Sequence, residues 1–224
     1  MNIKKELLNN RDLKLKDFTA NLNPTVDPKT IIGVRMPICK YIAKAAFKEG
    51  KYDKFLSDLP HKYFDEYCVH GYLISEIKDY CVTINYLNKF LPYINNWQVC
   101  DILKPKPFIK NKDKLIKDIK RWLKSKDTFT VRFAVSMLMT YYLDDDFDPS
   151  HLDLVGKVKS KEYYINMMRA WYFATALAKQ RDITVKYIEA KKLDDFTHNK
   201  AIQKAIESNR ISDKDKKYLK TLKV

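Results

Sequence analysis

The chain has 224 residues, of which 46 % are hydrophobic, so it is long and apolar enough to fold around a substantial core and is not a disordered chain. Its 43 lysines and arginines against 28 acidic residues give a formal net charge of +15, which is typical of proteins with a polyanionic partner. Only four glycines, no signal peptide and no run of about eighteen apolar residues occur, so we expect a cytoplasmic, all-helical protein rather than a secreted, membrane-spanning or sheet protein.

Prolines and short polar segments divide the sequence into helical patterns, and no strand-like alternation persists. Pro37 suits the first turn of one helix, and Ser212, with Asp215 three residues later, could cap the last. In chain order, the predicted helices span residues 3–9, 12–21, 37–49, 62–79, 81–91, 96–103, 113–125, 128–143, 161–179, 183–190, 197–208 and 212–222. Such a succession predicts stacked helix pairs in a single repeat domain over residues 1–224, with an irregular helical bundle as the alternative.

The positive charge is concentrated in one segment. From Lys104 to Lys126 the sequence carries ten basic residues and two acidic ones. A basic segment on a folded domain indicates a nucleic-acid partner, whereas the ordinary alternative is a solvated, lysine-rich helix face.

The cysteines and histidines do not predict a metal site. None of the four cysteines (Cys39, Cys68, Cys81 and Cys100) belongs to a CxxC pair, and no histidine lies at ligand spacing from them. Each cysteine lies within an apolar helical stretch. We therefore expect four reduced, buried thiols.

Four residues on three predicted helices combine into a possible site. Trp97 and Asp101 are four residues apart in NWQVCD and would share a helix face. Arg132 interrupts the apolar stretch TVRFAVSMLM, and Trp171 lies in YYINMMRAWYFATALAK. A carboxylate, a guanidinium and two indoles suit a polyanionic ligand that carries a cationic base. Each residue also has an ordinary explanation: a wedge between helices for Trp97, a surface carboxylate for Asp101, a solvent-facing stripe for Arg132 and a core position for Trp171.

His70 is a weaker candidate. In EYCVHGYLI it could serve as a general base paired with Glu66, four residues earlier. We expect it instead to pack within its helix, with Gly71 allowing a neighbouring helix to approach closely.

Six segments in chain order carry a family resemblance: IIGVRMPICKYIAK (31–44), EYCVHGYLI (66–74), NWQVCD (96–101), TVRFAVSMLM (130–139), YINMMRAW (164–171) and HNKAIQKAIESNRIS (198–212). Together they resemble the AlkD-like DNA alkylation repair enzymes, a family of DNA glycosylases built from HEAT-like helical repeats. The resemblance spans nearly the whole chain. It implies an all-α, HEAT-like solenoid (an α-α superhelix) with a concave basic surface that binds DNA.

The resemblance also implies the positions of the active site. The family's tryptophan and aspartate, four residues apart, match Trp97 and Asp101, its arginine matches Arg132, and its second tryptophan matches Trp171. An N-terminal tyrosine that lines the cleft in the best-known members has no counterpart here. Phe18 is nearby in sequence but lacks the hydroxyl group.

The implied reaction is hydrolysis of the N-glycosidic bond of cationic N3- or N7-alkylated purines in double-stranded DNA, without deep base flipping. Asp101 would stabilise the oxocarbenium-like transition state and orient the attacking water. Trp97 and Trp171 would offer cation–π and CH–π contacts, and Arg132 would bind the phosphate and hold Asp101 ionised. We expect no metal and no organic cofactor, no membrane, and a monomer.

Two other functions compete with the glycosylase. One is a non-catalytic HEAT-repeat protein that binds damaged or branched DNA, which the missing tyrosine favours. The other is a helical scaffold for a protein partner, which would show no salt-dependent affinity for DNA.

Overall fold

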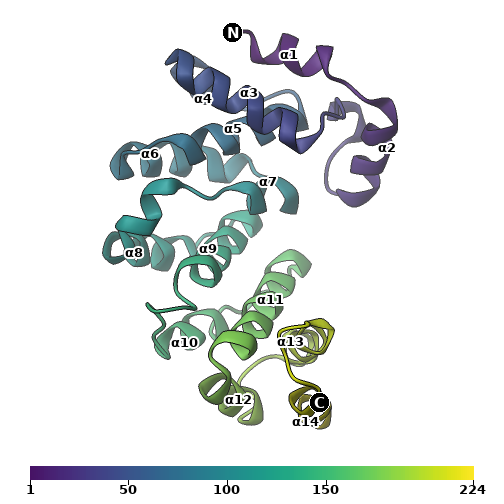
Figure 1. The fold of residues 1–224 in the computed structure, drawn as a ribbon, viewed down its shortest axis with the longest axis vertical. Helices are drawn as coiled ribbons and strands as arrows, with labels where there is room; N and C mark the ends of the chain where they lie inside the picture. Colours follow the sequence, from purple (N-terminus) through teal and green to yellow (C-terminus); the bar gives the residue numbers. More distant parts are fainter. The chain divides into compact units, whose positions relative to one another are not determined.

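A computed structural model describes residues 1–224. Its secondary structure is all helical: 70 % of the residues lie in helices and there are no strands (Figure 1). The all-helical prediction is confirmed. The α-helices are α1 (Ile3–Asn9), α2 (Leu13–Leu22), α3 (Met36–Glu49), α4 (Asp53–Ser57), α5 (Phe64–Glu76), α6 (Tyr80–Phe90), α7 (Trp97–Ile102), α8 (Lys112–Trp122), α9 (Thr128–Tyr141), α10 (Ser150–Gly156), α11 (Tyr163–Lys179), α12 (Arg181–Glu189), α13 (Asp195–Glu207) and α14 (Asp213–Thr221). Short 3₁₀-helices span Pro28–Thr30, Leu91–Tyr93 and Lys106–Lys110.

The chain divides into two compact units, Met1–Asn111 and Lys112–Val224, and each is described by itself. A single domain over the whole chain therefore stays a prediction. In the first unit, α3 packs against α5 and α5 against α7, while α1 and α6 lie against this row. In the second unit, α9, α11 and α13 form a row, and α8, α10, α12 and α14 each pack against one of its helices. This is the repeat-like pairing of helices that the sequence predicts.

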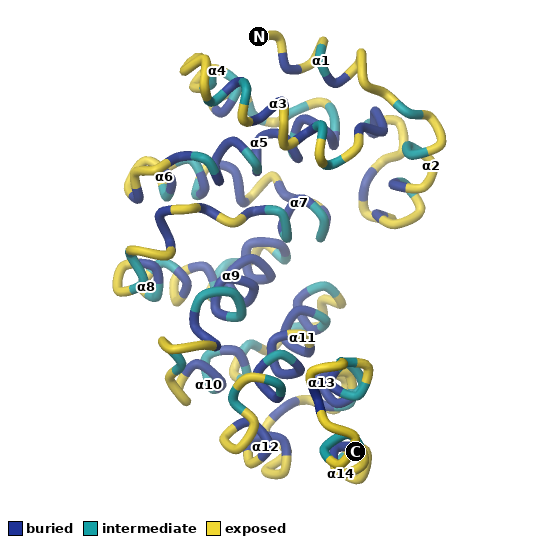
Figure 2. Tube along the Cα trace, in the orientation of Figure 1, coloured by how far each residue is buried: buried dark blue, intermediate teal, exposed yellow.

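The row helices carry the core of each unit. α5 is buried at ten of its thirteen positions, and α9 is buried without interruption from Phe129 to Leu138. In contrast, α14 buries only Leu219, and Figure 2 shows long exposed stretches on α12 and α14. A helix that is buried on most of its sides is enclosed by neighbouring helices. α5 and α9 therefore form the fixed frame on which a site can be built.

Gly71 on α5 lies against Ile102 on α7. A Cβ atom at this position would lie 3.4 Å from Cγ1 and Cδ1 of Ile102, which is an ordinary van der Waals distance. The contact between the two helices therefore does not require glycine, and the expectation that Gly71 is needed for a close approach is not supported.

A buried carboxylate fixes the loop before α3. Asp65 on α5 is 1 % exposed and accepts hydrogen bonds from the backbone N–H groups of Ile32 and Val34, both at 2.7 Å. Gly33, between them, has φ of +90°, and a Cβ there would lie 2.4 Å from the carbonyl oxygen of Asp12. Only glycine fits this position, because the backbone has a left-handed conformation and the backbone of Asp12 lies directly against it.

The predicted helices agree with the structure to within a few residues, and α4 and α10 are the two that the sequence did not predict. Pro37 lies in the first turn of α3, and the Ser212 hydroxyl accepts a hydrogen bond from Asp215 N at 3.1 Å, so both boundary predictions are confirmed. α4 and α10 have only five and seven residues, which is too short for a helical period to be visible in the sequence.

All four cysteines are free thiols, but Cys81 is exposed, so the prediction of four buried thiols is wrong for this residue. The buried positions of α6 are Tyr80, Thr83, Leu87 and Phe90, and Cys81 falls outside this stripe. No group of three or more histidine, cysteine, aspartate or glutamate residues is arranged to hold a metal ion. None of the helices combines the length and the apolar character needed to cross a membrane.

Candidate functional site

Trp97 and Asp101 lie in the first unit, on one face of α7. The helix begins at Trp97, and the Asn96 side chain caps it by accepting a hydrogen bond from Val99 N at 2.8 Å. Both candidate side chains are partly exposed. The short helix therefore presents an indole and a carboxylate together, one turn apart.

The Trp97 ring is held by the end of α2. Its indole Nε1–H donates to the carbonyl oxygen of Leu22 at 3.0 Å, and the Asn23 amide donates to Gln98 Oε1 at 2.9 Å. These two hydrogen bonds fasten the C-terminus of α2 to the first turn of α7. Because the N–H group is already used, what Trp97 can offer a ligand is the face of its ring.

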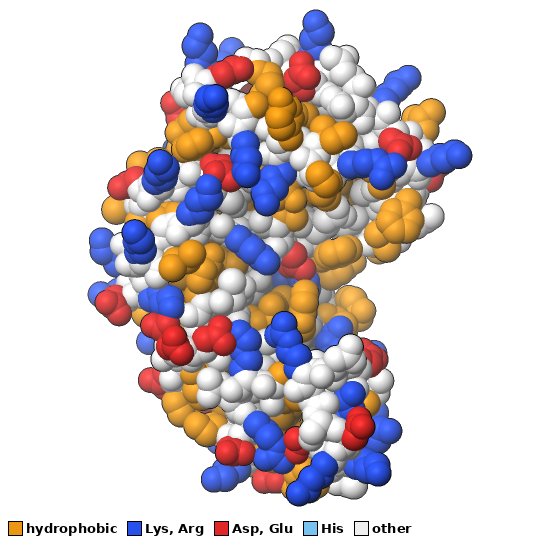
Figure 3. Space-filling model, viewed as in Figure 1, with side chains coloured by type: hydrophobic (Ala, Val, Ile, Leu, Met, Phe, Trp, Pro, Cys, Tyr) orange, Lys and Arg blue, Asp and Glu red, His pale blue; other side chains and the backbone are white.

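Phe18 is exposed on the same helix that holds Trp97. Its side chain is 59 % exposed, and Leu22, one turn later on the same face of α2, is 44 % exposed. Figure 3 shows hydrophobic side chains at the surface over α2. The first unit thus carries an apolar edge next to the Trp97–Asp101 face, made by Phe18 and Leu22.

Arg132 lies in the second unit, on α9, and is only 5 % exposed. One of its terminal nitrogens donates to the carbonyl oxygen of Tyr164 at 3.1 Å, in the first turn of α11. Ser136, one turn further along α9, is also buried. The alternative that Arg132 begins a solvent-facing stripe is therefore wrong.

Trp171 lies on the exposed strip of α11. From Ile165 to Leu177 the helix is buried except at Met167, Trp171 and Thr175, which lie on one side of it. Trp171 is 44 % exposed, so a core position is excluded. The helix therefore presents this large aromatic ring to solvent while its neighbours on the other sides are buried.

A second arginine of the same helix has a structural role that sequence reasoning missed. Arg169 is 2 % exposed, and its guanidinium donates to Val155 O at 3.2 Å and Gly156 O at 3.1 Å at the end of α10. It also donates to the Asp194 carboxylate at 2.7 Å, at the start of α13, and to Asn166 and Thr197. Arg169 therefore joins α10, α11 and α13 and stabilises the second unit.

His70 is a packing residue, as expected. Its ring is 0 % exposed and stacks on Phe90 at 3.8 Å between ring centroids. Its partner is His61, with 2.7 Å between Nε2 of His61 and Nδ1 of His70, and not Glu66, whose carboxylate caps α5 through Tyr63 N. Burial lowers the pKa of His61 to about 4 and that of His70 well below its ordinary value. Because the His70 ring is fully buried and kept neutral, it cannot act on a substrate as a general base.

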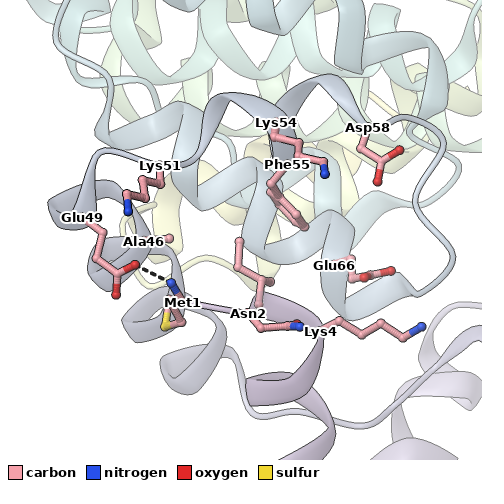
Figure 4. A pocket seen from close by; sticks show the side chains of 11 residues that line it. Met1, Asn2, Lys4, Ala46, Glu49, Lys51, Lys54, Phe55, Asp58 and Glu66 are labelled. Carbon is pink, nitrogen blue, oxygen red and sulfur yellow. Dashed lines mark hydrogen bonds and ion pairs between the residues drawn. The ribbon is translucent and has the colours of Figure 1, made fainter.

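The first unit also has a pocket of about 480 Å³, which Figure 4 shows from close by. Three lysines and three acidic residues line it together with the N-terminal residues, and the amino group of Met1 forms an ion pair with Glu49 at 2.5 Å. Neither Trp97 nor Asp101 takes part. The balanced charges and the absence of a candidate residue separate this pocket from the proposed site. Its charged lining residues are Lys4, Glu49, Lys51, Lys54, Asp58 and Glu66.

Five of the ten basic residues of the segment from Lys104 to Lys126 lie on α8, which packs against the row helix α9. On α8 the buried positions are Leu115, Ile119 and Trp122, and the lysines occupy the exposed face. The candidate residues Trp97, Asp101, Arg132 and Trp171 all lie instead on the row helices α7, α9 and α11. The lysines of α8 and the candidate site residues therefore belong to different helices.

Comparison with known protein families identifies the chain. The model of the family described as "DNA alkylation repair enzyme" matches residues 3–207. No curated protein matches the chain. Since the match covers α1 to α13 and every candidate residue, the chain belongs to the DNA alkylation repair enzyme family.

Proposed function

We propose that the protein is a DNA glycosylase that excises cationic N3- or N7-alkylated purines from double-stranded DNA by hydrolysis of the N-glycosidic bond. The observation that carries the proposal is the shared face of Trp97 and Asp101 on α7, in a chain that belongs to a DNA alkylation repair family. In this proposal the protein acts as a monomer in the cytoplasm and uses water as its co-substrate.

Asp101 is the electrostatic centre of the proposed reaction. An alkylated purine that carries a positive charge leaves as a neutral base, because the electron pair of the broken bond stays with it. Positive charge then develops at C1′ of the sugar, where a nearby carboxylate stabilises it. Water adds to C1′ and loses a proton to Asp101, which leaves an abasic site.

The two tryptophans supply π surface to the cation. Trp171 is 44 % exposed on the strip of α11, and Trp97 has its N–H engaged by Leu22, so each acts through a ring face. A cation over such a face gains about 0.5–2 kcal/mol. This contribution disappears when the base becomes neutral and helps to discriminate alkylated from ordinary purines. The lesion need not enter a deep pocket for these contacts to form.

Arg132 is proposed to bind the phosphate beside the lesion. The Tyr164 carbonyl and the surrounding α9 core fix the direction of its guanidinium, so little side-chain entropy is lost on binding.

Release of free base from a duplex that carries N-methylated purines tests the function. We expect wild-type protein to release 7-methylguanine or 3-methyladenine at neutral pH, and Asp101→Asn to lose release by at least about 100-fold while it still binds the duplex. Release that survives Asp101→Asn would refute the role of the carboxylate.

A second function is favoured by one observation, the lack of a counterpart to the family's N-terminal cleft tyrosine, near which the sequence has only Phe18. A protein that had lost the chemistry would bind damaged or branched DNA without base release. Tight, salt-sensitive binding of the methylated duplex without any free base would favour this alternative.

A further inference from the structure

The second unit contains a groove that the proposed reaction does not use. It has a volume of about 450 Å³ and lies between the end of α8 and the end of α10, and we call it the α8–α10 groove. Its lining residues are Lys120, Leu123, Lys124, Leu154, Lys157, Val158 and Lys159. This volume falls within the range of roughly 300–1,000 Å³ that is usual for binding sites in proteins.

Backbone hydrogen bonds fix both walls of the groove. Beyond the last residue of α8, Leu123 N donates to Ile119 O at 2.9 Å, and beyond α10, Lys157 N donates to Asp153 O at 2.9 Å. Val158 N donates to Val155 O at 3.3 Å. The groove is therefore a built feature of two helix ends and not a gap between mobile side chains.

Its charge is of one sign. Four of the seven lining residues are exposed lysines, and no carboxylate lines the groove. Ammonium groups close together repel one another, and an anionic ligand reduces this repulsion. The charge therefore favours a negatively charged occupant.

The floor of the groove selects the class of occupant. Leu123, Leu154 and Val158 are partly exposed between the lysines. Aliphatic side chains gain nothing from a phosphate backbone, which proteins contact mainly through charged and polar groups. They do gain from burying another aliphatic side chain, at about 25 cal/mol per Å².

The location of the groove agrees with a role apart from the DNA site. Its walls come from α8, α10 and the residues that follow them, whereas Arg132 and Trp171 belong to the row helices α9 and α11. The groove also contains none of the aromatic side chains on which nucleobases stack.

We propose that the α8–α10 groove docks an acidic, aliphatic segment of a partner protein. Carboxylates on the segment pair with lysines on the two walls, and a leucine or a similar side chain fills the floor between them. An amphipathic helix presents such a pattern when apolar residues recur every three or four positions and acidic residues flank them.

The test uses the full chain and a fluorescein-labelled peptide of glutamate and leucine, with the leucines three and four residues apart, followed by fluorescence anisotropy. We expect the peptide to bind wild-type protein, and the double variant Lys124→Glu/Lys157→Glu to weaken binding by at least about tenfold. The matched control is Lys186→Glu/Lys217→Glu, which changes two exposed lysines of the same unit outside the groove by the same charge. This control should change binding by less than about threefold.

A second peptide, with serine in place of every leucine, tests the floor. Loss of binding by this peptide supports the groove, while equal binding of both peptides would mean general attraction to a basic protein and would overturn the proposal.

Labelled duplex DNA provides the last comparison. If Lys124→Glu/Lys157→Glu weakens DNA binding more than the control pair does, the groove is a nucleic-acid surface and the proposal fails. Base release is independent of this outcome, because no lining residue has been assigned to the reaction.

Discussion

The indole N–H of Trp97 donates to the carbonyl oxygen of Leu22 over 3.0 Å, and this contact ties the helix that carries Phe18 to the helix that carries Asp101. The hydrogen bond orients the ring, and it also uses the only polar group the ring has. Any contribution of Trp97 to base release must therefore come through its π surface, whereas its N–H group contributes to stability.

This separation predicts different effects for two substitutions of Trp97. Trp97→Phe keeps an aromatic face but removes the donor, so we expect the free energy of unfolding to fall by about 1 kcal/mol and base release to fall only a few-fold. Trp97→Ala removes both and should lower base release by about tenfold or more. Urea unfolding and a base-release assay on the methylated duplex measure the two effects. Equal rates for the two variants would contradict a contact through the ring.

Phe18 is predicted to contribute to the reaction and little to stability. Because it is 59 % exposed, Phe18→Ala should change the free energy of unfolding by less than about 0.5 kcal/mol. Base release should fall several-fold if the ring lines the cleft, and Phe18→Tyr should retain it. The control is Tyr93→Ala, which removes another exposed aromatic ring of the first unit outside α2 and α7. If both alanine variants keep the wild-type rate, Phe18 has no part in the site.

The same substitution at two buried arginines should have opposite consequences. Lysine cannot reproduce the hydrogen bonds that Arg169 makes to α10, Asn166, Asp194 and Thr197, so Arg169→Lys should lower the free energy of unfolding by about 3 kcal/mol. Arg132→Lys keeps the positive charge and a donor for the Tyr164 carbonyl but loses the planar guanidinium, so we expect its main effect on base release.

Base release separates the two arginines. Arg132→Lys should release base at least about tenfold more slowly at a temperature where both variants are folded, while Arg169→Lys should stay near the wild-type rate. A larger loss of rate in Arg169→Lys than in Arg132→Lys would reverse the assignment of the two residues.

The sequence predicted the long helices because burial leaves a periodic pattern. It also predicted Trp97 and Asp101 on one face, since a spacing of four is a local property of α7. It could not predict that Arg132 is buried and Trp171 exposed. Both lie in mostly apolar helices, and the difference depends on which neighbours pack against each side.

Other features that the sequence analysis did not predict depend on contacts between residues distant in sequence. Asp65 binds the backbone of Ile32 and Val34 across more than thirty residues, and no local signal in either segment indicates the partner. Gly33 was part of a recognisable motif, but its reason, a left-handed backbone pressed against Asp12, is visible only in the folded chain. The same holds for the α8–α10 groove, whose two lysine-bearing walls are more than thirty residues apart in sequence.

The buried pair His61–His70 predicts that stability falls in mild acid. Burial lowers the pKa of both rings, to about 4 for His61, while Asp58 opposes this shift only in part. In the unfolded chain both rings take up protons near pH 6.5, so below that pH the unfolded state binds more protons than the folded one. The contribution of the pair to the free energy of unfolding is therefore complete above pH 6.5 and is lost as the pH falls toward 4. The pKa shift of His61 alone corresponds to about 3 kcal/mol.

Urea unfolding at pH 7, 6 and 5 measures this slope, and His61→Gln provides the control. Glutamine retains a hydrogen-bond partner for Nδ1 of His70 but does not titrate, so the variant should lose less stability between pH 7 and 5 than wild type does. Burial raises the pKa of Asp65 and lowers that of His151, so both groups also contribute to the slope, but they contribute equally to the two proteins and the difference isolates His61. An equal slope in both proteins would mean that His61 is solvated and charged in the folded chain, and the stack on Phe55 at 4.5 Å between ring centroids would then have to open in mild acid.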